Sequence, residues 1–358
     1  MRVRRIKLNR TRLLLGGVAI LGVLSAAGML ATEFEIHQIS SGVYANAMWP
    51  GSSPNITWNL NFLTTSTPAN VVENGGVTAS TVIANSFATW HNAKYNSSSV
   101  TKVAFTFGGG STSFPASPTI DCQNVISFSD PESSDFPTGI IAITQIATVT
   151  NGETPSQCGS NAPPACPIDV CIVDADIVFN PAVTFATTSP GTNQFDLQSV
   201  ATHEIGHLMG LDHSGIANAV MFPYGDTSAV GVHQVLWTDD LIGVSHLYPG
   251  TTTPNAGIGG QISLVQSGTG LSTLLYGAHV VAIDAATGNV VTDTLTDPSG
   301  NYNLLTFGGT FYVFVQSLGQ TTDWGPCTID NFKGQAGFGN NNFADIPANP
   351  TDYTGAYY

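Results

Sequence analysis

The sequence predicts an α+β domain followed by a small all-β sandwich, and a contrast along the chain supports this division. Residues 53–250 mix strand-like alternation with stretches of helical spacing, whereas residues 257–318 contain short alternating runs divided by turns. Residues 251–256 form a linker by composition, because they are rich in Thr and include Pro254. The 358 residues are enough for two such domains.

The first 31 residues are predicted to be a secretory signal peptide. Six of the 9 basic residues precede Leu13, and an apolar run then extends to Ala31 with small residues near its end. The run is also long enough for an uncleaved membrane anchor, and the membrane is an expected partner in that case alone. We therefore expect a secreted chain, extracellular or periplasmic, in which residues 32–52 are a short segment too small to fold alone.

The charge of the exported chain argues against a nucleic-acid partner. Beyond residue 31 the basic residues are Lys94, Lys102 and Lys333, against 24 acidic residues. Such a surface repels nucleic acids and anionic membranes.

Five cysteines suit an exported protein. None has the paired CxxC spacing of a zinc ribbon, so one or two disulfides with one thiol left over are expected. Three of them lie in a segment rich in Pro, Asn and Gly, where a bridge would pin a loop to a partner that the sequence does not identify. The cysteines are Cys122, Cys158, Cys166, Cys171 and Cys327.

The elements of the first domain follow from periodicity. Val82, Ile83, Phe87 and Trp90 recur at helical spacing and predict a helix over 79–92. Further helices are expected over 194–210 and over 238–247, the last with Thr238 as N-cap. Strands are expected at 55–62, 103–107, 124–128, 139–149 and 175–179.

The second domain shows four alternating runs. The turns between them include Thr287-Gly288 and Gly308-Gly309, which suits an antiparallel sandwich. The runs cover 278–283, 290–296, 302–307 and 310–315. Residues 319–358 are rich in Asn, Gly and aromatic side chains and are left without a predicted fold.

The stretch from His203 to His213 carries the chemistry. His203 and His207 are four residues apart and share one face of the expected helix, so both can bind one metal ion. Gly210 can take a positive φ, end the helix and turn the chain so that His213 becomes a third ligand. Three protein ligands leave one position of a tetrahedral zinc open, which is typical of a catalytic zinc.

These residues resemble the metzincin metallopeptidases, and within them the matrixin-like family. Ala219-Val220-Met221-Phe222-Pro223-Tyr224 is similar to the turn that places a methionine, here Met221, beneath the metal. Trp237-Thr238-Asp239-Asp240 is similar to the start of the family's closing helix. The resemblance covers about residues 54–250 and implies a zincin-like fold with a twisted, mostly parallel sheet and an active-site helix. Residues 257–317 resemble the carboxypeptidase-regulatory-like (transthyretin-like) sandwich through Gly277-Ala278 and Gly300-Asn301-Tyr302.

The resemblance implies a zinc endopeptidase that hydrolyses proteins or peptides. Glu204, adjacent to the first ligand, would be the general base, and residues 53–250 would act without the second domain. Calcium is a further expected ion at Asp174, Asp176 and the run 130–135, although acidic loops are often simply solvated. Two alternatives stay open: a catalytically silent zincin-fold adhesion or binding protein, and a sandwich that targets the protease to carbohydrate or cell wall.

Overall fold

The computed structural model describes most of residues 36–316. The gaps are 41–42, 117–118, 131–135, 137–138, 226, 228–230, 266–269, 276 and 298, and residues 356–357 are described as well. The predicted signal peptide, Cys327 and nearly all of the 319–358 tail lie outside the described residues. Within the described parts, no helix has the length and apolar character needed to cross a membrane.

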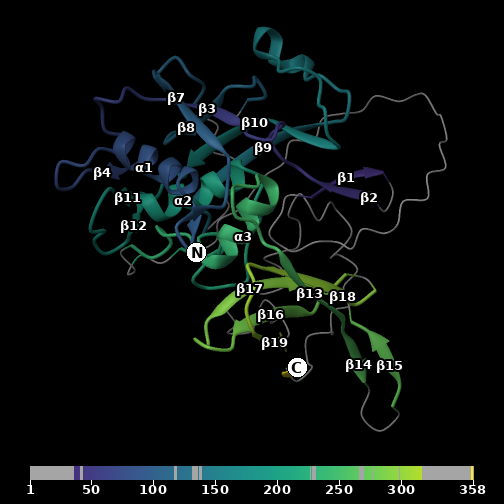
Figure 1. Cartoon of the computed structure of the whole chain (residues 1–358). Helices are drawn as coiled ribbons and strands as arrows, with labels where there is room; N and C mark the ends of the chain where they lie inside the picture. Colours follow the sequence, from purple (N-terminus) through teal and green to yellow (C-terminus); the bar gives the residue numbers. More distant parts are fainter. Residues whose placement is uncertain are drawn as a thin grey trace.

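A five-stranded sheet forms the centre of the first domain (Figure 1), in the order β7-β3-β8-β10-β9. The strands are β3 (Asn55–Leu60), β7 (Ala104–Gly110), β8 (Asn124–Ser127), β9 (Ala142–Thr150) and β10 (Val170–Phe179). The pairs β3–β7, β3–β8 and β8–β10 are parallel, whereas β9 runs antiparallel to β10 at one edge. The expected mostly parallel sheet is confirmed, with one antiparallel edge strand.

Two helices pack against each other beside this sheet. They are α1 (Ala79–His91) and α2 (Leu197–Leu208). The predicted apolar stripe of α1 is buried, and the Trp90 indole donates to Thr202 O of α2 at 2.8 Å. Phe87 stacks on Trp58 of β3 with ring centroids 4.4 Å apart. Burial of these aromatic rings supplies a large apolar contact that fixes α2 relative to the sheet.

The beginning of α2 differs from the prediction. Residues Gln194–Asp196 are a strand, β12, that pairs in parallel with β11 (Thr184–Ala186), so the helix begins at Leu197. Asp196 caps the helix by accepting from Ser199 N at 2.9 Å. The remaining short strands are β1 (Ile36–Ser40), β2 (Val43–Asn46), β4 (Val71–Val72), β5 (Lys94–Tyr95) and β6 (Ser98–Ser99). A 3₁₀ helix, η1, covers Ser156–Asn161.

Helix α3 (Thr238–Leu247) has the predicted bounds but another N-cap. The cap is Trp237, whose backbone N–H donates to Asp240 Oδ2 at 2.7 Å. Asp240, in the first turn, therefore accepts a backbone N–H at the N-terminus of the helix, and Thr238 is the first helical residue.

The C-terminal β region, residues 256–316 together with 356–357, contains strands and no helix among its described residues. It has a β13–β18 pair, a β14–β15 hairpin and a sheet in the order β17-β16-β19-β20. The strands are β13 (Ala256–Gln261), β14 (Ser263–Val265), β15 (Ser272–Leu274), β16 (His279–Asp284), β17 (Val290–Leu295), β18 (Asn301–Thr306), β19 (Phe311–Gln316) and β20 (Ala356–Tyr357). This content is compatible with the expected sandwich, whose carboxypeptidase-regulatory-like identity stays a prediction.

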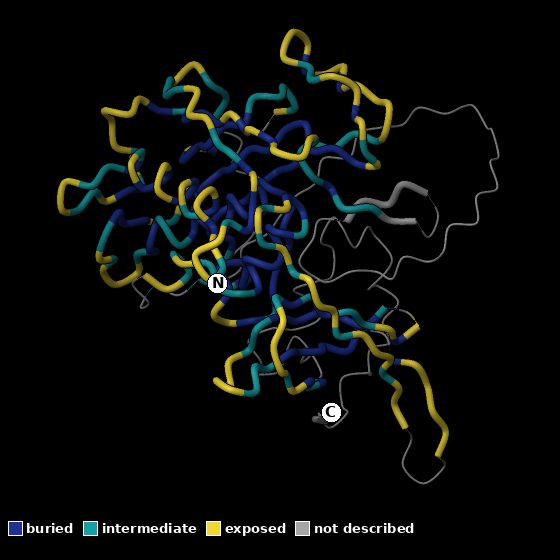
Figure 2. Tube along the Cα trace, viewed as in Figure 1, coloured by how far each residue is buried: buried dark blue, intermediate teal, exposed yellow. Residues whose placement is uncertain are grey.

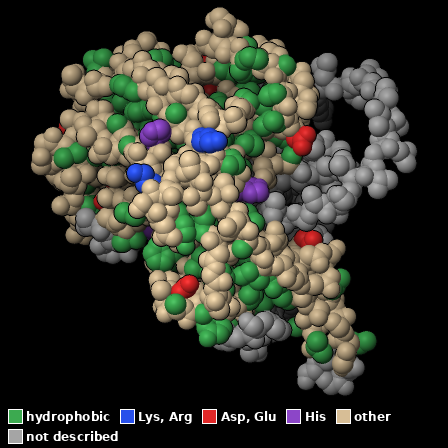
Figure 3. All heavy atoms as spheres, in the orientation of Figure 1, with side chains coloured by type: hydrophobic (Ala, Val, Ile, Leu, Met, Phe, Trp, Pro, Cys, Tyr) green, Lys and Arg blue, Asp and Glu red, His purple; other side chains and the backbone are tan. Residues whose placement is uncertain are grey.

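Buried residues continue from the first domain into the C-terminal β region, whereas the β14–β15 hairpin is exposed (Figure 2). Strand β17 lies beside α3, and Tyr95 stacks on Phe307 with ring centroids 4.1 Å apart. The face drawn in Figure 3 carries a few isolated charged side chains among polar and apolar ones.

Candidate metal centre

The three predicted histidine ligands come together in the structure. One nitrogen of each of His203, His207 and His213 lies within 4.8 Å of the corresponding atoms of the other two. All three side chains are buried, with 4% exposure or less. A protonated, positively charged imidazole is costly in such a place, so three clustered buried rings favour neutral imidazoles that share a cation.

Backbone carbonyls determine which nitrogen of two rings is available to a metal. His203 Nδ1 lies 2.7 Å from Val220 O, and His207 Nδ1 lies 2.9 Å from Leu211 O. A carbonyl oxygen can only accept, so Nδ1 carries the proton in both rings and Nε2 carries the lone pair. The site therefore has the tautomers that a metal needs.

The spacing of one pair of nitrogens is close to that of zinc ligands. His207 Nε2 and His213 Nε2 are 3.2 Å apart. Two nitrogens at about 2.0–2.1 Å from a tetrahedral zinc lie about 3.3 Å apart, which is close to this distance.

A glycine turn brings His213 to the helix. Gly210 has φ = +100°, and Leu211 N donates to Gly206 O at 3.0 Å, so the chain reverses directly after α2. A Cβ on Gly210 would lie 2.3 Å from Ala47 O, which excludes a side chain there. The predicted role of Gly210 is confirmed.

Glu204 lies next to the cluster and contacts the edge strand. The Thr144 hydroxyl of β9 lies 2.5 Å from Glu204 Oε2 and 3.1 Å from Glu204 O. Both residues are fully buried. A hydroxyl donor at this distance holds the carboxylate in one orientation. The sequence marks Thr144 only as a strand residue, so this contact was not foreseen.

Met221 lies in a turn beneath α2. It is 2% exposed, and its backbone carbonyl accepts from Ser214 N at 3.0 Å. A Cβ added to Gly206 of α2 would come within 2.2 Å of Met221 Sδ, so the methionine packs directly against the helix backbone between two of the histidines. A place for Met221 beneath the metal itself stays a prediction.

Asp240 holds this methionine turn from α3. Its carboxylate accepts from Val220 N at 2.9 Å and from Met221 N at 3.1 Å. Burial raises the pKa of Asp240 to about 6, against the opposing effect of these backbone donors. The sequence indicated Asp240 merely as a favourable charge at a helix N-terminus. Asp240 also holds Val220, whose carbonyl orients the His203 ring, so it helps to position a metal ligand.

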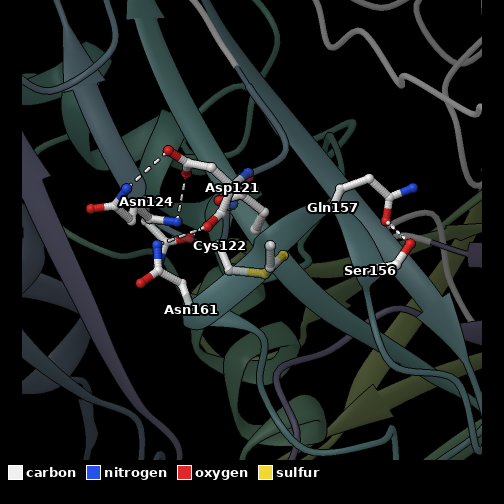
Figure 4. Close-up of a disulfide and its surroundings, with 10 residues drawn as sticks. Asp121, Cys122, Asn124, Ser156, Gln157 and Asn161 are labelled. Atoms are coloured by element: carbon white, nitrogen blue, oxygen red, sulfur yellow. Dashed lines mark hydrogen bonds between the residues drawn. A yellow bond between two sulfur atoms is a disulfide. The ribbon is translucent and has the colours of Figure 1, made fainter.

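Two disulfides lie around η1 and β10. They join Cys122 to Cys158 and Cys166 to Cys171. Figure 4 shows the first bridge with Asn161 donating to Asp121 O at 3.3 Å. Both bridges agree with the expected number, and the pairing is the part that the sequence left open.

Two buried carboxylates of β10 lie beside this bridged segment. Asp176 accepts from Val125 N and Thr119 N, and Asp174 accepts from Asp121 N at 3.0 Å. Burial raises the pKa of Asp174 to about 7 and the pKa of Asp176 well above its usual range. Asp174 Oδ1 has no hydrogen-bond partner among the described residues. The other part of the calcium prediction, residues 131–135, lies outside the described residues.

Comparison with known proteins agrees with this geometry. Residues 162–249 match the family model described as Matrixin. Similar curated proteins include metalloendoproteinase 5-MMP of Arabidopsis thaliana, 49% identical over 73 residues, which are 20% of this chain and 19% of that protein. Metalloendoproteinase 1 of Glycine max is 48% identical over 64 residues, 17% of this chain and 20% of that protein. Karilysin of Tannerella forsythia is 45% identical over 53 residues, 15% of this chain and 10% of that protein.

The matched segments span a fifth or less of the length of these three relatives. The residues that match the family model, 162–249, include the three-histidine group. Family and site together support a matrixin-like zinc metalloprotease, in general terms and for this part of the chain.

Proposed function

We propose that the protein is a secreted zinc-dependent endopeptidase. The observation that carries the proposal is the convergence of His203, His207 and His213 with Glu204 beside them, inside the segment that matches the Matrixin family. The Nε2 atoms would hold the metal, because Nδ1 of the two helical ligands is engaged by backbone carbonyls.

When bound, zinc would supply the Lewis acid that polarises the scissile carbonyl and activates water. Glu204 would accept the proton of the attacking water and pass it to the leaving amine, as its place next to His203 allows. Thr144 would keep the Glu204 carboxylate oriented for both transfers, through the 2.5 Å contact with Oε2.

Strand β9 supports a role in substrate binding. Among the described residues it pairs only with β10, so its other edge can accept an extended peptide through main-chain hydrogen bonds. Thr144 lies on this same strand, which would bring a bound peptide close to Glu204. Main-chain pairing does not read side chains, so cleavage preference would come from other contacts.

Substitution of the proposed base tests the activity. Glu204→Ala should lower kcat/KM on casein or a peptide library by roughly 10²–10⁴-fold while zinc stoichiometry stays unchanged. Asp169→Ala, which removes an exposed carboxylate far from the histidines in sequence, is the control and should retain wild-type rates. Cleavage by the Glu204 variant at the wild-type rate would refute the assignment.

The alternative, a silent binding protein with a zincin fold, predicts a different outcome in the same assay. The wild-type chain would then bind zinc but cut no member of the library. The buried Glu204 and its hydroxyl partner favour the peptidase, because a purely structural zinc site needs no positioned base.

We also propose that a calcium ion binds near Asp174 and Asp176. Two buried carboxylates on one strand, both with raised pKa, are a costly arrangement that a cation would relieve. Oxygen ligands are what calcium prefers, and the Asp174 variant described in the Discussion tests this site.

A further inference from the structure

The turn after the third histidine contacts the C-terminal β region. Gly215 N donates to Asp293 Oδ2 at 2.9 Å, and the Ser214 hydroxyl lies 3.4 Å from Asp293 Oδ1. Asp293 belongs to β17 and is 1% exposed. A strand of the second domain thus binds the two residues that follow His213.

Asp293 is itself held from two sides. His279 Nε2, on the neighbouring strand β16, lies 2.5 Å from Asp293 Oδ2. Asp293 N donates to Asp239 Oδ1 of α3 at 3.3 Å, and Asp239 Oδ2 accepts from the Ser214 hydroxyl at 2.5 Å. Ser214, Asp239 and Asp293 therefore form a closed set of contacts that joins the metal-site turn, α3 and β17.

The Asp293 carboxylate depends on these contacts because it is buried. A carboxylate removed from water is costly unless donors replace its hydration, and here Gly215 N and His279 Nε2 supply them. An ordinary contact between two linked domains would leave such a group hydrated at the surface. The Asp293 carboxylate is instead enclosed by protein, and the turn supplies one of its donors. The same hydrogen bond holds the turn against β17.

The fit at this contact is close. A Cβ on Gly215 would lie 2.4 Å from Asp293 Oδ2 and 2.7 Å from His279 Nε2. Strand β17 also accepts the Trp237 indole N–H at Val290 O, 2.8 Å away, which ties the start of α3 to the same strand. Both the turn and α3 are therefore anchored to β17 (Figure 1).

We propose that the C-terminal β region completes the metal centre, with Asp293 as a positioning residue for the third ligand. His213 is then fixed from both sides: by the Gly210 turn before it and by the Asp293 anchor after it. The proposal rests on the zinc-binding part of the proposed function. It departs from the expectation that residues 53–250 act alone, which stays a prediction, because that segment lacks both Asp293 and His279.

Zinc affinity of the full-length protein tests the role of Asp293. Asp293→Ala should raise the Zn²⁺ dissociation constant, measured by competition with a chelator, about 10-fold, as loss of an outer-sphere partner does. The absorption spectrum of the Co²⁺-substituted variant should shift, because His213 changes its position relative to the metal. Asp284→Ala, which changes a partly buried aspartate at the end of β16 in the same sheet, is the control and should leave both readouts unchanged.

A second variant covers the case in which Asp293→Ala does not fold. Gly215→Ala leaves every acid in place but pushes the turn away from Asp293, and it should weaken zinc to a similar extent. Wild-type zinc affinity and an unchanged Co²⁺ spectrum in the folded variants would overturn the proposal. If the wild-type chain binds zinc and cleaves nothing, the peptidase proposal fails, while the affinity comparison still decides the role of Asp293.

Discussion

Replacement of Gly206 by alanine sets two opposing effects against each other inside the zinc helix. Alanine in a helix interior is favoured over glycine by about 0.5–1 kcal/mol. The added Cβ, however, would lie 2.2 Å from Met221 Sδ and 3.0 Å from Trp90 Cζ2. Ordinary contact begins near 3.4 Å, so the methionine must retreat by about 1 Å inside a buried core.

The collision should outweigh the helix preference. Overpacking of this kind costs about 1–3 kcal/mol, so Gly206→Ala should lower the free energy of unfolding by about 1 kcal/mol net. Met221→Ala alone should lower it by about 2–5 kcal/mol, because a buried methionine is removed. In the double variant the space left by Met221 accepts the new methyl group, and the helix preference of alanine is recovered.

Denaturant unfolding of the wild type, both single variants and the double variant gives the coupling free energy between the two positions. We expect the double variant to be more stable than the sum of the single effects by at least about 1 kcal/mol. Additivity within about 0.5 kcal/mol would refute the direct packing of Met221 on the helix backbone. Greater stability of Gly206→Ala than of the wild type would refute it as well.

Substitutions at two other positions test the surroundings of the site. Burial raises the pKa of Asp174 from 3.8 to about 7, so ionisation favours the unfolded chain, and the free energy of unfolding should fall as the pH rises through this interval. In zinc-loaded, calcium-free buffer Asp174→Asn should flatten that dependence of stability on pH. Added Ca²⁺ should raise the melting temperature of the wild type more than that of the variant. Equal pH slopes would contradict the raised pKa of Asp174, and equal calcium effects would contradict the calcium site. Thr144→Val should lower kcat/KM on the order of tenfold because Glu204 loses its orienting hydroxyl, whereas Thr144→Ser should stay near wild type. A serine variant as slow as the valine variant would show that the methyl group matters instead of the hydroxyl.

Local patterns made the helices and the ligand set predictable. The stripe of Val82, Ile83, Phe87 and Trp90 identifies α1 because helical periodicity is visible within one segment. The spacing of the histidines and the glycine after them likewise identifies the metal ligands from eleven consecutive residues, and Gly210 takes the positive φ that the turn needs. Such features depend on neighbours in sequence, which is the information that a single chain contains.

Contacts between distant segments were not predictable in this way. The start of α2 was placed one turn too early because residues Gln194–Asp196 pair with β11, and strand pairing overrides local helical spacing. Thr144 meets Glu204 across 60 positions, and Asp293 meets Gly215 across 78. Nothing near Asp293 distinguishes it from the other acids of its region. Its role follows from where β17 is placed relative to the turn after His213.

The arrangement around the histidines links metal binding to folding. The rings of His203 and His207 are oriented by carbonyls of the 211–220 segment, and that segment is held by Asp240 of α3 and Asp293 of β17. Both acids are buried, and a buried carboxylate is unfavourable unless donors or a nearby cation compensate it. A divalent ion held by the three imidazoles would join α2 to the turn that carries His213, so zinc loss should loosen the 211–220 segment and its contact with the C-terminal β region together.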